Sequence, residues 1–326
     1  MRLNKNFGEQ GVMKLDEPRA YVGGLAVADF DLDALTDAVY FGTTSNTDPE
    51  FTPVTQGGKL FSLRINNNEP NNGRFYPQEM INARRPIQQR PIISTDKNAN
   101  RWLHFGTGSI QTSSDLISQP QNRLYGIKES RYVNGDFKMD HHISAKTIQL
   151  NDLVDVSRAE VNALSGSLKG VSIMPALKND HVVALDKRLQ GYDDSSVYHS
   201  GWFKTLTPSE YAVGESTLLG GFYFQNAYSP DRKNCRLGGG FTQYRLKHTT
   251  GTSWFNVQKP KYGQARSDSL KQGLQTARPL ESLLHLGELR IKNQMNMLNL
   301  SSEGPIYVDE ISVDNISSQV VGWCAL

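Results

Sequence analysis

Short apolar and aromatic runs, each about the length of a β-strand, recur along this chain between clusters of Gly, Asn, Pro and Asp. Runs bounded by turn-forming residues are typical of strands joined by turns and loops. The runs are AVYFGT (38–43), KLFSLRI (59–65), RWLHFGTG (101–108), NRLYGIK (122–128), HVVALD (181–186), GGFYFQNAY (220–228) and FTQYRLK (241–247). The sequence therefore predicts an all-β protein with long irregular loops and a few short helices.

Helical periodicity is rare in this sequence. Residues 156–168 are expected to form a short helix, because Val156, Val161 and Leu164 would share one side of it. The leucine spacing in residues 280–291 fits either a helix or two strands joined at Gly287. We therefore expect short helices at most, among many strands.

A weak internal repeat suggests how the strands are grouped. Three segments, which begin at Gly58, Asn122 and Gly240, share one order of residues: Gly or Asn, one further residue, an apolar pair, a spacer and another apolar residue. HVVALDKR starts near the midpoint between the second and third segments. A period of roughly 60 residues with several strands each is typical of propeller blades with long loops. We predict a modified β-propeller, which can be incomplete; an irregular β-sandwich is the alternative. Large aromatic side chains are expected to pack between the blades, namely Trp102, Trp202, Trp254 and Trp323.

Charge and composition exclude several classes of function. Lys plus Arg is 35 and Asp plus Glu is 33, giving a net charge of +2, so nothing favours nucleic acid or an anionic membrane as partner. No window approaches the roughly 18 apolar residues of a membrane span, and no signal peptide is visible at the N-terminus. Cys235 and Cys324 fit no zinc or redox pattern, and a disulfide and two free thiols both stay open.

The most specific local feature is a run of alternating aspartates. With Asp29 as position 1, Asp31 is position 3, Asp33 is position 5, Leu35 is position 7 and Asp37 is position 9. This is the ligand spacing of an EF-hand-type calcium loop, in which position 7 contributes its backbone carbonyl. Calcium requires six to eight oxygen ligands and would offset the repulsion among the carboxylates. The sequence therefore predicts a calcium site at residues 29–37.

The surroundings of this loop depart from a true EF-hand. Both flanks resemble strands, position 12 is Tyr40 rather than Glu, and position 6 is Ala34 rather than Gly. An alanine held at positive φ costs on the order of 1 kcal/mol, so we expect modest affinity. Water, Asp48 or Glu50 would complete the ligand shell. The alternative is a solvated acidic turn that binds no metal.

Three segments resemble, in order, the C-terminal domain of the PilC/PilY family of type IV pilus biogenesis factors and tip adhesins. The segments are VADFDLDALTDAVYFGT…GGKLFSLRI, RPIQQRPIISTDKNANRWLHFGTGSI…DLISQPQNRLYGIKES, and GWFKTLTPSEYAVGESTLLGGFYFQNAYSPDRKNCRLGGGFTQYRLK. In the third segment, the matching positions are Gly201-Trp202, Glu215, Gly220-Gly221 and Cys235. The resemblance covers most of residues 20–250.

The resemblance implies a single β-propeller-like domain over residues 1–326, as the C-terminal part of a larger protein. It implies Ca²⁺ bound by Asp29, Asp31, Asp33, the Leu35 carbonyl and Asp37. It further implies a protein at the cell surface, at the pilus tip or associated with the outer membrane. The partners would be minor pilins of the pilus tip complex, and a host or abiotic surface.

Two other classes of function remain as alternatives. A quinoprotein-type dehydrogenase propeller also uses calcium, but such enzymes usually carry adjacent bonded cysteines, whereas Cys235 and Cys324 lie far apart in this sequence. A generic extracellular module that binds protein or glycan is the second alternative. No serine-hydrolase elbow and no phosphate-binding glycine loop that opens a helix is present. We therefore expect a protein that is not an enzyme.

Overall fold

The computed structural model describes most of the chain between Leu15 and Ser312. The described residues are 15, 17, 19–30, 32–46, 56–65, 75–98, 100–110, 115, 119–129, 147–162, 165–177, 179–191, 199–230, 239–252, 269–272, 279–285, 294–301 and 307–312. This part is predominantly β-structure, as predicted, and consists of several open, mainly antiparallel sheets. No helix in the described ranges is both long and apolar enough to cross a membrane.

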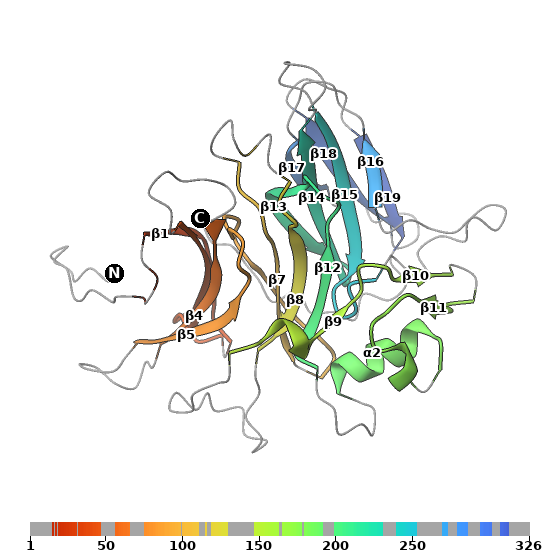
Figure 1. Cartoon of the computed structure of the whole chain (residues 1–326), viewed down its shortest axis with the longest axis horizontal. Helices are drawn as coiled ribbons and strands as arrows, with labels where there is room; N and C mark the ends of the chain where they lie inside the picture. The colour runs from red at the N-terminus through yellow and green to blue at the C-terminus, as the bar shows by residue number, and fades with distance from the viewer. Residues whose placement is uncertain are drawn as a thin grey trace, which may run out of the picture.

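The first sheet is an antiparallel meander at the left of Figure 1. In spatial order it comprises β1 (Ala20–Ala28), β2 (Ala38–Asn46), β4 (Lys59–Ile65) and β5 (Phe75–Asn82), and the short β3 (Gln56–Gly57) pairs with β2. The runs 38–43 and 59–65 are therefore strands, as predicted.

The second sheet lies beside the first and contains strands from two distant parts of the chain (Figure 1). Its spatial order is β6 (Ile92–Thr95), β7 (Arg101–Gly106), β8 (Arg123–Lys128), β12 (Gly201–Thr205) and β9 (Leu153–Asp155). Only the β12–β9 pair is parallel among these strands. Between β8 and β12 along the chain lie β10 (Glu160–Val161), β11 (Leu168–Lys169), two 3₁₀ turns at Leu150–Asp152 and Met174–Ala176, and α2 (Val182–Gln190).

Two further antiparallel meanders follow. The third sheet comprises β13 (Tyr211–Leu219), β14 (Phe222–Pro230), β15 (Gly239–Lys247) and β16 (Ser269–Gln272). The fourth comprises β17 (Pro279–His285), β18 (Gln294–Ser301) and β19 (Tyr307–Ser312). Gly220 and Gly221 both have positive φ and form the two-residue hairpin turn between β13 and β14.

The first strand of each sheet contacts the first strand of the next sheet. β1 contacts β6, β6 contacts β13, and β13 contacts β17. Each of these strands is also an edge of its own sheet, so successive sheets approach one another along their first strands. The Gly58, Asn122 and Gly240 repeats fall at β4, β8 and β15, one in each of the first three sheets.

The second sheet is buried on both of its faces, and two core clusters result. Toward the first sheet it presents Leu103, Phe105, Tyr125, Ile127 and Phe203. Toward the third sheet and α2 it presents Trp102, Leu124, Val154 and Trp202. Alternate residues of β7 and β8 therefore contact different neighbours, which explains their almost continuous burial. Trp102 and Trp202 are fully buried between sheets, as predicted, whereas Trp254 and Trp323 lie outside the described residues.

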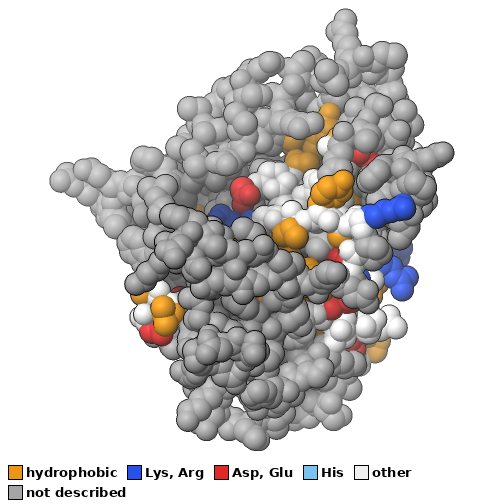
Figure 2. Space-filling view, turned by 90° about the vertical axis from the view of Figure 1, so that its left-hand side faces the viewer, with side chains coloured by type: hydrophobic (Ala, Val, Ile, Leu, Met, Phe, Trp, Pro, Cys, Tyr) orange, Lys and Arg blue, Asp and Glu red, His pale blue; other side chains and the backbone are white. Residues whose placement is uncertain are grey.

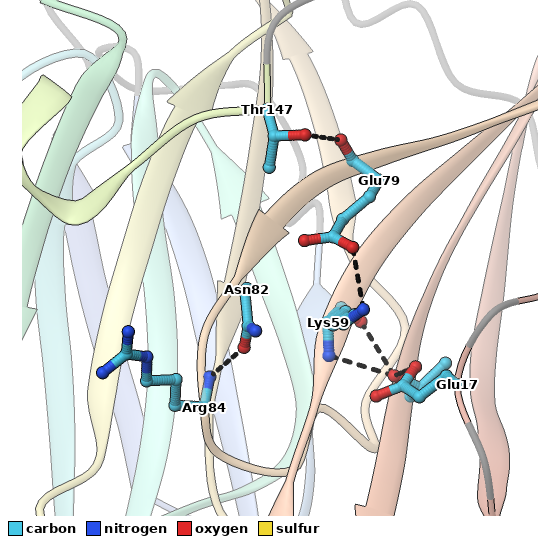
Figure 3. A network of polar contacts seen from close by, with 7 residues as sticks. Glu17, Lys59, Glu79, Asn82, Arg84 and Thr147 are labelled. Carbon is cyan, nitrogen blue, oxygen red and sulfur yellow. Dashed lines mark hydrogen bonds and ion pairs between the residues drawn. The ribbon is translucent and has the colours of Figure 1, made fainter.

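Polar contacts join strands of the first sheet to one another and to residues outside the sheet (Figure 3). The Thr43 hydroxyl donates to Glu17 Oε2 (2.6 Å) and accepts from the Lys59 backbone N–H (3.0 Å). The Lys59 ammonium pairs with Glu79 Oε2 at 2.8 Å, and Thr147 donates to the Glu79 carbonyl at 3.2 Å. These contacts link β2, β4 and β5 with segments before and after the sheet.

Strand β1 exposes large apolar side chains along its length. They are Tyr21, Val22, Leu25 and Val27, each more than half exposed. In Figure 2, which views the left-hand side of Figure 1, the visible hydrophobic side chains are interspersed with polar and charged ones. The buried alanines of β1, Ala26 and Ala28, face the second sheet instead.

The run 181–186 was wrongly predicted to be a strand, because it forms the start of α2. Val182, Leu185 and Leu189 are buried on one side of this helix, the 3–4 residue spacing of an amphipathic helix. His181 caps the N-terminus, where its Nδ1 accepts from the Val183 N–H (3.1 Å), and Gly191 at φ 79° ends the helix. The helical spacing of the apolar residues becomes clear only over the nine residues of α2. The six residues HVVALD alone therefore resemble a strand.

The predicted helix at 156–168 is also wrong in the described part of that segment. The Asp155 carboxylate accepts from the backbone N–H of Ser157 (2.8 Å) and stabilises a turn instead of a helix start. β10 and β11 then pair Val161 with Leu168. Apolar residues with helical spacing are thus buried here by a short hairpin; Leu164 lies outside the described residues.

For residues 280–291, the strand alternative holds as far as the structure describes them, since β17 covers Pro279–His285. Residues 286–293, and with them Gly287, lie outside the described residues. Cys235 and Cys324 lie outside them as well, so the question of a disulfide stays where the sequence left it.

Candidate metal centre

The aspartate loop joins two antiparallel neighbours of the first sheet, β1 and β2. Ala28 pairs with Ala38 at the base of the loop, and the Asp37 N–H donates to the Ala28 carbonyl at 2.9 Å. The predicted strand–loop–strand setting is therefore confirmed. The two ends of the loop are held together by this pairing, so Asp29 and Asp37 lie at the adjacent ends of two paired strands.

The described carboxylates of the loop accept hydrogen bonds from its own backbone. Asp29 accepts from the N–H groups of Leu32 (2.7 Å, Oδ1) and Ala34 (2.9 Å, Oδ2). Asp33 Oδ1 accepts from the Leu35 N–H at 2.7 Å, and Asp37 Oδ2 accepts from the Phe30 N–H at 2.5 Å. These bonds curl the backbone around its acidic side chains.

The backbone conformation at position 6 agrees with the spacing argument. Ala34 has φ 65° and Leu32 has φ 60°, both in the left-handed region that non-glycine residues seldom adopt. The loop therefore makes the sharp turn at Ala34 even though a side chain is present, at a cost on the order of 1 kcal/mol. A calcium loop needs this turn at its sixth position, where glycine is usual. In this chain alanine makes the same turn.

The donor set suits a hard cation, although the described residues supply only part of it. Each carboxylate oxygen that accepts one N–H retains a lone pair for a further partner. Within the described ranges, however, no group of three His, Cys, Asp or Glu side chains is placed to hold a metal ion. Asp31, the predicted position 3 ligand, and the auxiliary candidates Asp48 and Glu50 lie outside those ranges. The turn at Ala34 and the ligand types are those of a calcium loop, but the described carboxylates of Asp29, Asp33 and Asp37 do not come together as such a group.

A buried charge cluster lies next to this loop. The Arg101 guanidinium stacks on the Phe30 ring, with Cζ 3.4 Å from the ring centroid, and its Nη1 lies 3.1 Å from Glu129 Oε2. Glu129 Oε1 also accepts from Arg64 Nη2 (2.9 Å) and from the Tyr40 hydroxyl (2.9 Å). The side chains of Glu129 and Arg64 are 5% and 9% exposed, so Glu129 is a buried carboxylate shared by two arginines.

The cluster connects the first two sheets. Tyr40 and Arg64 belong to β2 and β4, whereas Arg101 starts β7 and Glu129 directly follows β8. Burial, followed by the neighbouring Glu129 charge, raises the pKa of Tyr40 well above its ordinary value. The Tyr40 hydroxyl therefore stays a hydrogen-bond donor. No sequence motif indicates this cluster, because its members are far apart in the chain.

A second buried polar group lies between the second and third sheets. Ser94 Oγ is 2.9 Å from His104 Nε2 and 3.0 Å from His248 Nδ1. Within the part of the chain that the structure describes, His104 Nδ1 is buried with no hydrogen-bond partner. The arrangement therefore differs from a catalytic triad, in which a carboxylate orients the histidine through its other nitrogen. We interpret it as a structural contact between two sheets.

This histidine pair predicts acid sensitivity. Burial lowers the pKa of His104, and burial, followed by the Lys247 charge, lowers the pKa of His248 to about 4 despite the opposing charges of Asp186 and Asp96. The unfolded chain thus binds more protons than the folded chain below pH 6.5, and stability falls as the pH falls. We expect urea denaturation to show a loss on the order of 2 kcal/mol from His248 alone between pH 6.5 and 4.5, and a further loss from His104.

The variant His248→Asn provides the check on this assignment. It should remove roughly half of the pH dependence of the unfolding free energy over that interval, because an asparagine cannot take up the proton whereas His104 remains. A wild-type protein equally stable at pH 6.5 and pH 4.5 would contradict the assignment.

Comparison with known proteins adds no family to this picture. No protein-family model matches the chain, and no curated protein matches it. The resemblance to the PilC/PilY C-terminal domain therefore stays a prediction from the segments quoted above.

Proposed function

We propose that this chain is a non-enzymatic, calcium-binding β-propeller domain that acts in type IV pilus assembly, in the control of pilus retraction and in surface adhesion. The observation that carries the proposal is the loop between β1 and β2, with its alternating aspartates and its left-handed turn at Ala34. The carboxylates of Asp29, Asp31, Asp33 and Asp37 and the carbonyl of Leu35 would hold Ca²⁺, whose charge offsets their mutual repulsion.

The arrangement of the sheets supports the propeller part of the proposal. Propeller blades are antiparallel meanders of about four strands placed around a central axis. Here four successive sheets contact one another through their first strands, β1, β6, β13 and β17, and the buried faces of the second sheet pack against its two neighbours. Such blades need not form a closed ring within this chain.

Exposed apolar side chains support a protein partner near the loop. Beyond the four on β1, the loop itself exposes Leu32 and Leu35, at 74% and 49%. Apolar side chains that gather on a surface favour an interaction site. The proposed partners are minor pilins of the tip complex, and the proposed location is the cell surface at the pilus tip.

Calorimetric titration with calcium tests the metal site. We expect saturable heat for the wild-type chain and loss of that heat in the double variant Asp31→Ala, Asp37→Ala, because two of the four carboxylates are removed. The matched control is Asp180→Asn, an exposed aspartate just before α2, which should bind calcium like the wild type. Equal heats for the wild type and the double variant would refute the site.

Retention of purified minor pilins on the immobilised chain tests the pilus role. We expect stronger retention in calcium than in a chelator, because an ordered loop presents Leu32 and Leu35 in one arrangement. Failure to retain minor pilins in either buffer would contradict the pilus role but leave the calcium site unaffected.

A further inference from the structure

Two arginines lie together at one end of the contact between the first two sheets. Alternate side chains of β8 face the first sheet, since Tyr125 and Ile127 belong to the core cluster between the sheets and Glu129 follows in the same register. Arg123, the first residue of β8, lies on this face as well, and its Cζ is 5.6 Å from the centroid of the Phe203 ring. Arg123 and Glu129 therefore lie at opposite ends of one face of β8.

Arg85 approaches the Arg123 end from the connection between β5 and β6. The Gly108 N–H donates to the carbonyl of Pro86, the residue after Arg85, and the Thr107 N–H donates to the Arg123 carbonyl, both at 2.9 Å. Two consecutive residues thus hold the two arginine-bearing segments side by side. Burial, followed by the neighbouring Arg123 charge, lowers the pKa of Arg85, as expected for two guanidinium groups that repel each other.

The two ends of the contact differ in how their arginines are neutralised. Arg64 and Arg101 share the Glu129 carboxylate. In the part of the chain that the structure describes, no carboxylate lies within ion-pair distance of Arg85 or Arg123, and the Arg123 Nε is a buried donor without a hydrogen-bond partner. Two like charges held together in a partly buried place repel each other, and an anion between them would offset that repulsion.

We propose that Arg85 and Arg123 form a binding site for a phosphate group, between the β5–β6 connection and the start of β8. Guanidinium groups offer planar pairs of donors that match the oxygens of carboxylates and phosphates. A phosphate monoester carries a charge of about −1.5 to −2 at pH 7, which balances two guanidinium groups better than one carboxylate does. The site uses no residue of the proposed calcium loop and therefore goes beyond the proposed function.

Calorimetric titration of the full chain with inorganic phosphate, in calcium-free buffer of low ionic strength, tests this site. We expect saturable binding by the wild type and about tenfold weaker binding by Arg85→Gln and by Arg123→Gln, because each variant loses charge-assisted hydrogen bonds. The matched control is Arg84→Gln, which removes the same charge from an exposed side chain one residue away (Figure 3). Its affinity should change by less than about twofold. An equal loss in Arg84→Gln would show general attraction by a basic segment and overturn the site.

Thermal unfolding separates a ligand site from a structural role. Without phosphate, Arg85→Gln should unfold at the wild-type temperature or slightly above it, because the change removes the repulsion from Arg123. Added phosphate should raise the unfolding midpoint of the wild type but not that of the variant, since only the wild type binds it appreciably. A variant that unfolds earlier without phosphate and still shows the full phosphate-dependent shift would assign Arg85 a structural role and overturn the site.

Parallel titrations with acetate and with phosphoserine identify the chemistry of the ligand and its source. Acetate should bind about tenfold more weakly than phosphate, because it carries one negative charge rather than about two. Acetate binding as tight as phosphate binding would contradict a phosphate site. Phosphoserine bound as tightly as inorganic phosphate would support a site for a phosphate monoester, and binding of inorganic phosphate alone would support a site for the free ion.

The outcomes are independent of the calcium titration. Absence of saturable phosphate binding by the wild type would overturn this inference and leave the calcium site unaffected. Absence of calcium binding would overturn the calcium site alone. If Arg123→Gln fails to fold, Arg85→Gln still decides, because wild-type phosphate affinity in that variant would contradict the proposal.

Discussion

Replacing Glu129 with alanine is expected to destabilise the protein by about 3–5 kcal/mol, because the change leaves two arginines without their shared buried carboxylate. Arg64 and Arg101 lie 2.9 and 3.1 Å from the two Glu129 oxygens, and the Glu129 side chain is only 5% exposed. The Tyr40 hydroxyl loses its acceptor as well. Urea denaturation monitored by circular dichroism measures the loss.

The control for this prediction is Glu79→Ala in β5 of the first sheet. Glu79 pairs with Lys59 at a similar distance, 2.8 Å, but these side chains are 30% and 21% exposed. Exposed ion pairs contribute little, so we expect a loss below about 1 kcal/mol. Equal losses for the two variants would show that the cluster around Glu129 does not hold the first two sheets together.

Gly126→Ala is expected to destabilise the protein by about 3 kcal/mol through overpacking. A Cβ at this position would overlap the ring of Trp202, a fully buried residue of β12. Two contacts keep the indole in place. The backbone of Gly251 lies against the same ring, and the indole N–H donates to the His248 carbonyl at 2.8 Å.

The matched change is Gly240→Ala in β15, where a Cβ meets none of the described residues within 4 Å. We expect this variant to be as stable as the wild type or slightly more so, since alanine loses less backbone entropy on folding. Thermal unfolding of both variants provides the comparison. A stable Gly126→Ala protein would mean that Trp202 is not packed between the sheets as described.

Strand content was the most predictable property of this sequence, and the predictions failed where a short window did not decide the local structure. KLFSLRI became β4 over the predicted residues, because Gly58 precedes it and Phe61, Leu63 and Ile65 alternate with polar residues. HVVALD failed because a helical capping residue, His181, and the later Leu189 decide its structure. The six-residue window ends before Leu189 and Gly191, which complete the helical spacing and end the helix.

The site was predictable in its local part only. The spacing of the aspartates predicted a loop between two strands and a strained turn at Ala34, and both are present. The attachment of Phe30 to Arg101 and Glu129 depends on which sheets become neighbours. That information arises from tertiary packing, so no local sequence pattern contains it.

The most direct test of the calcium site is an anomalous difference map from a crystal of this chain grown with calcium. The account predicts a peak in the loop between β1 and β2, about 2.3–2.6 Å from oxygens of Asp29, Asp31, Asp33 and Asp37 and from the Leu35 carbonyl. A map without a peak there, with these carboxylates directed toward solvent, would contradict it.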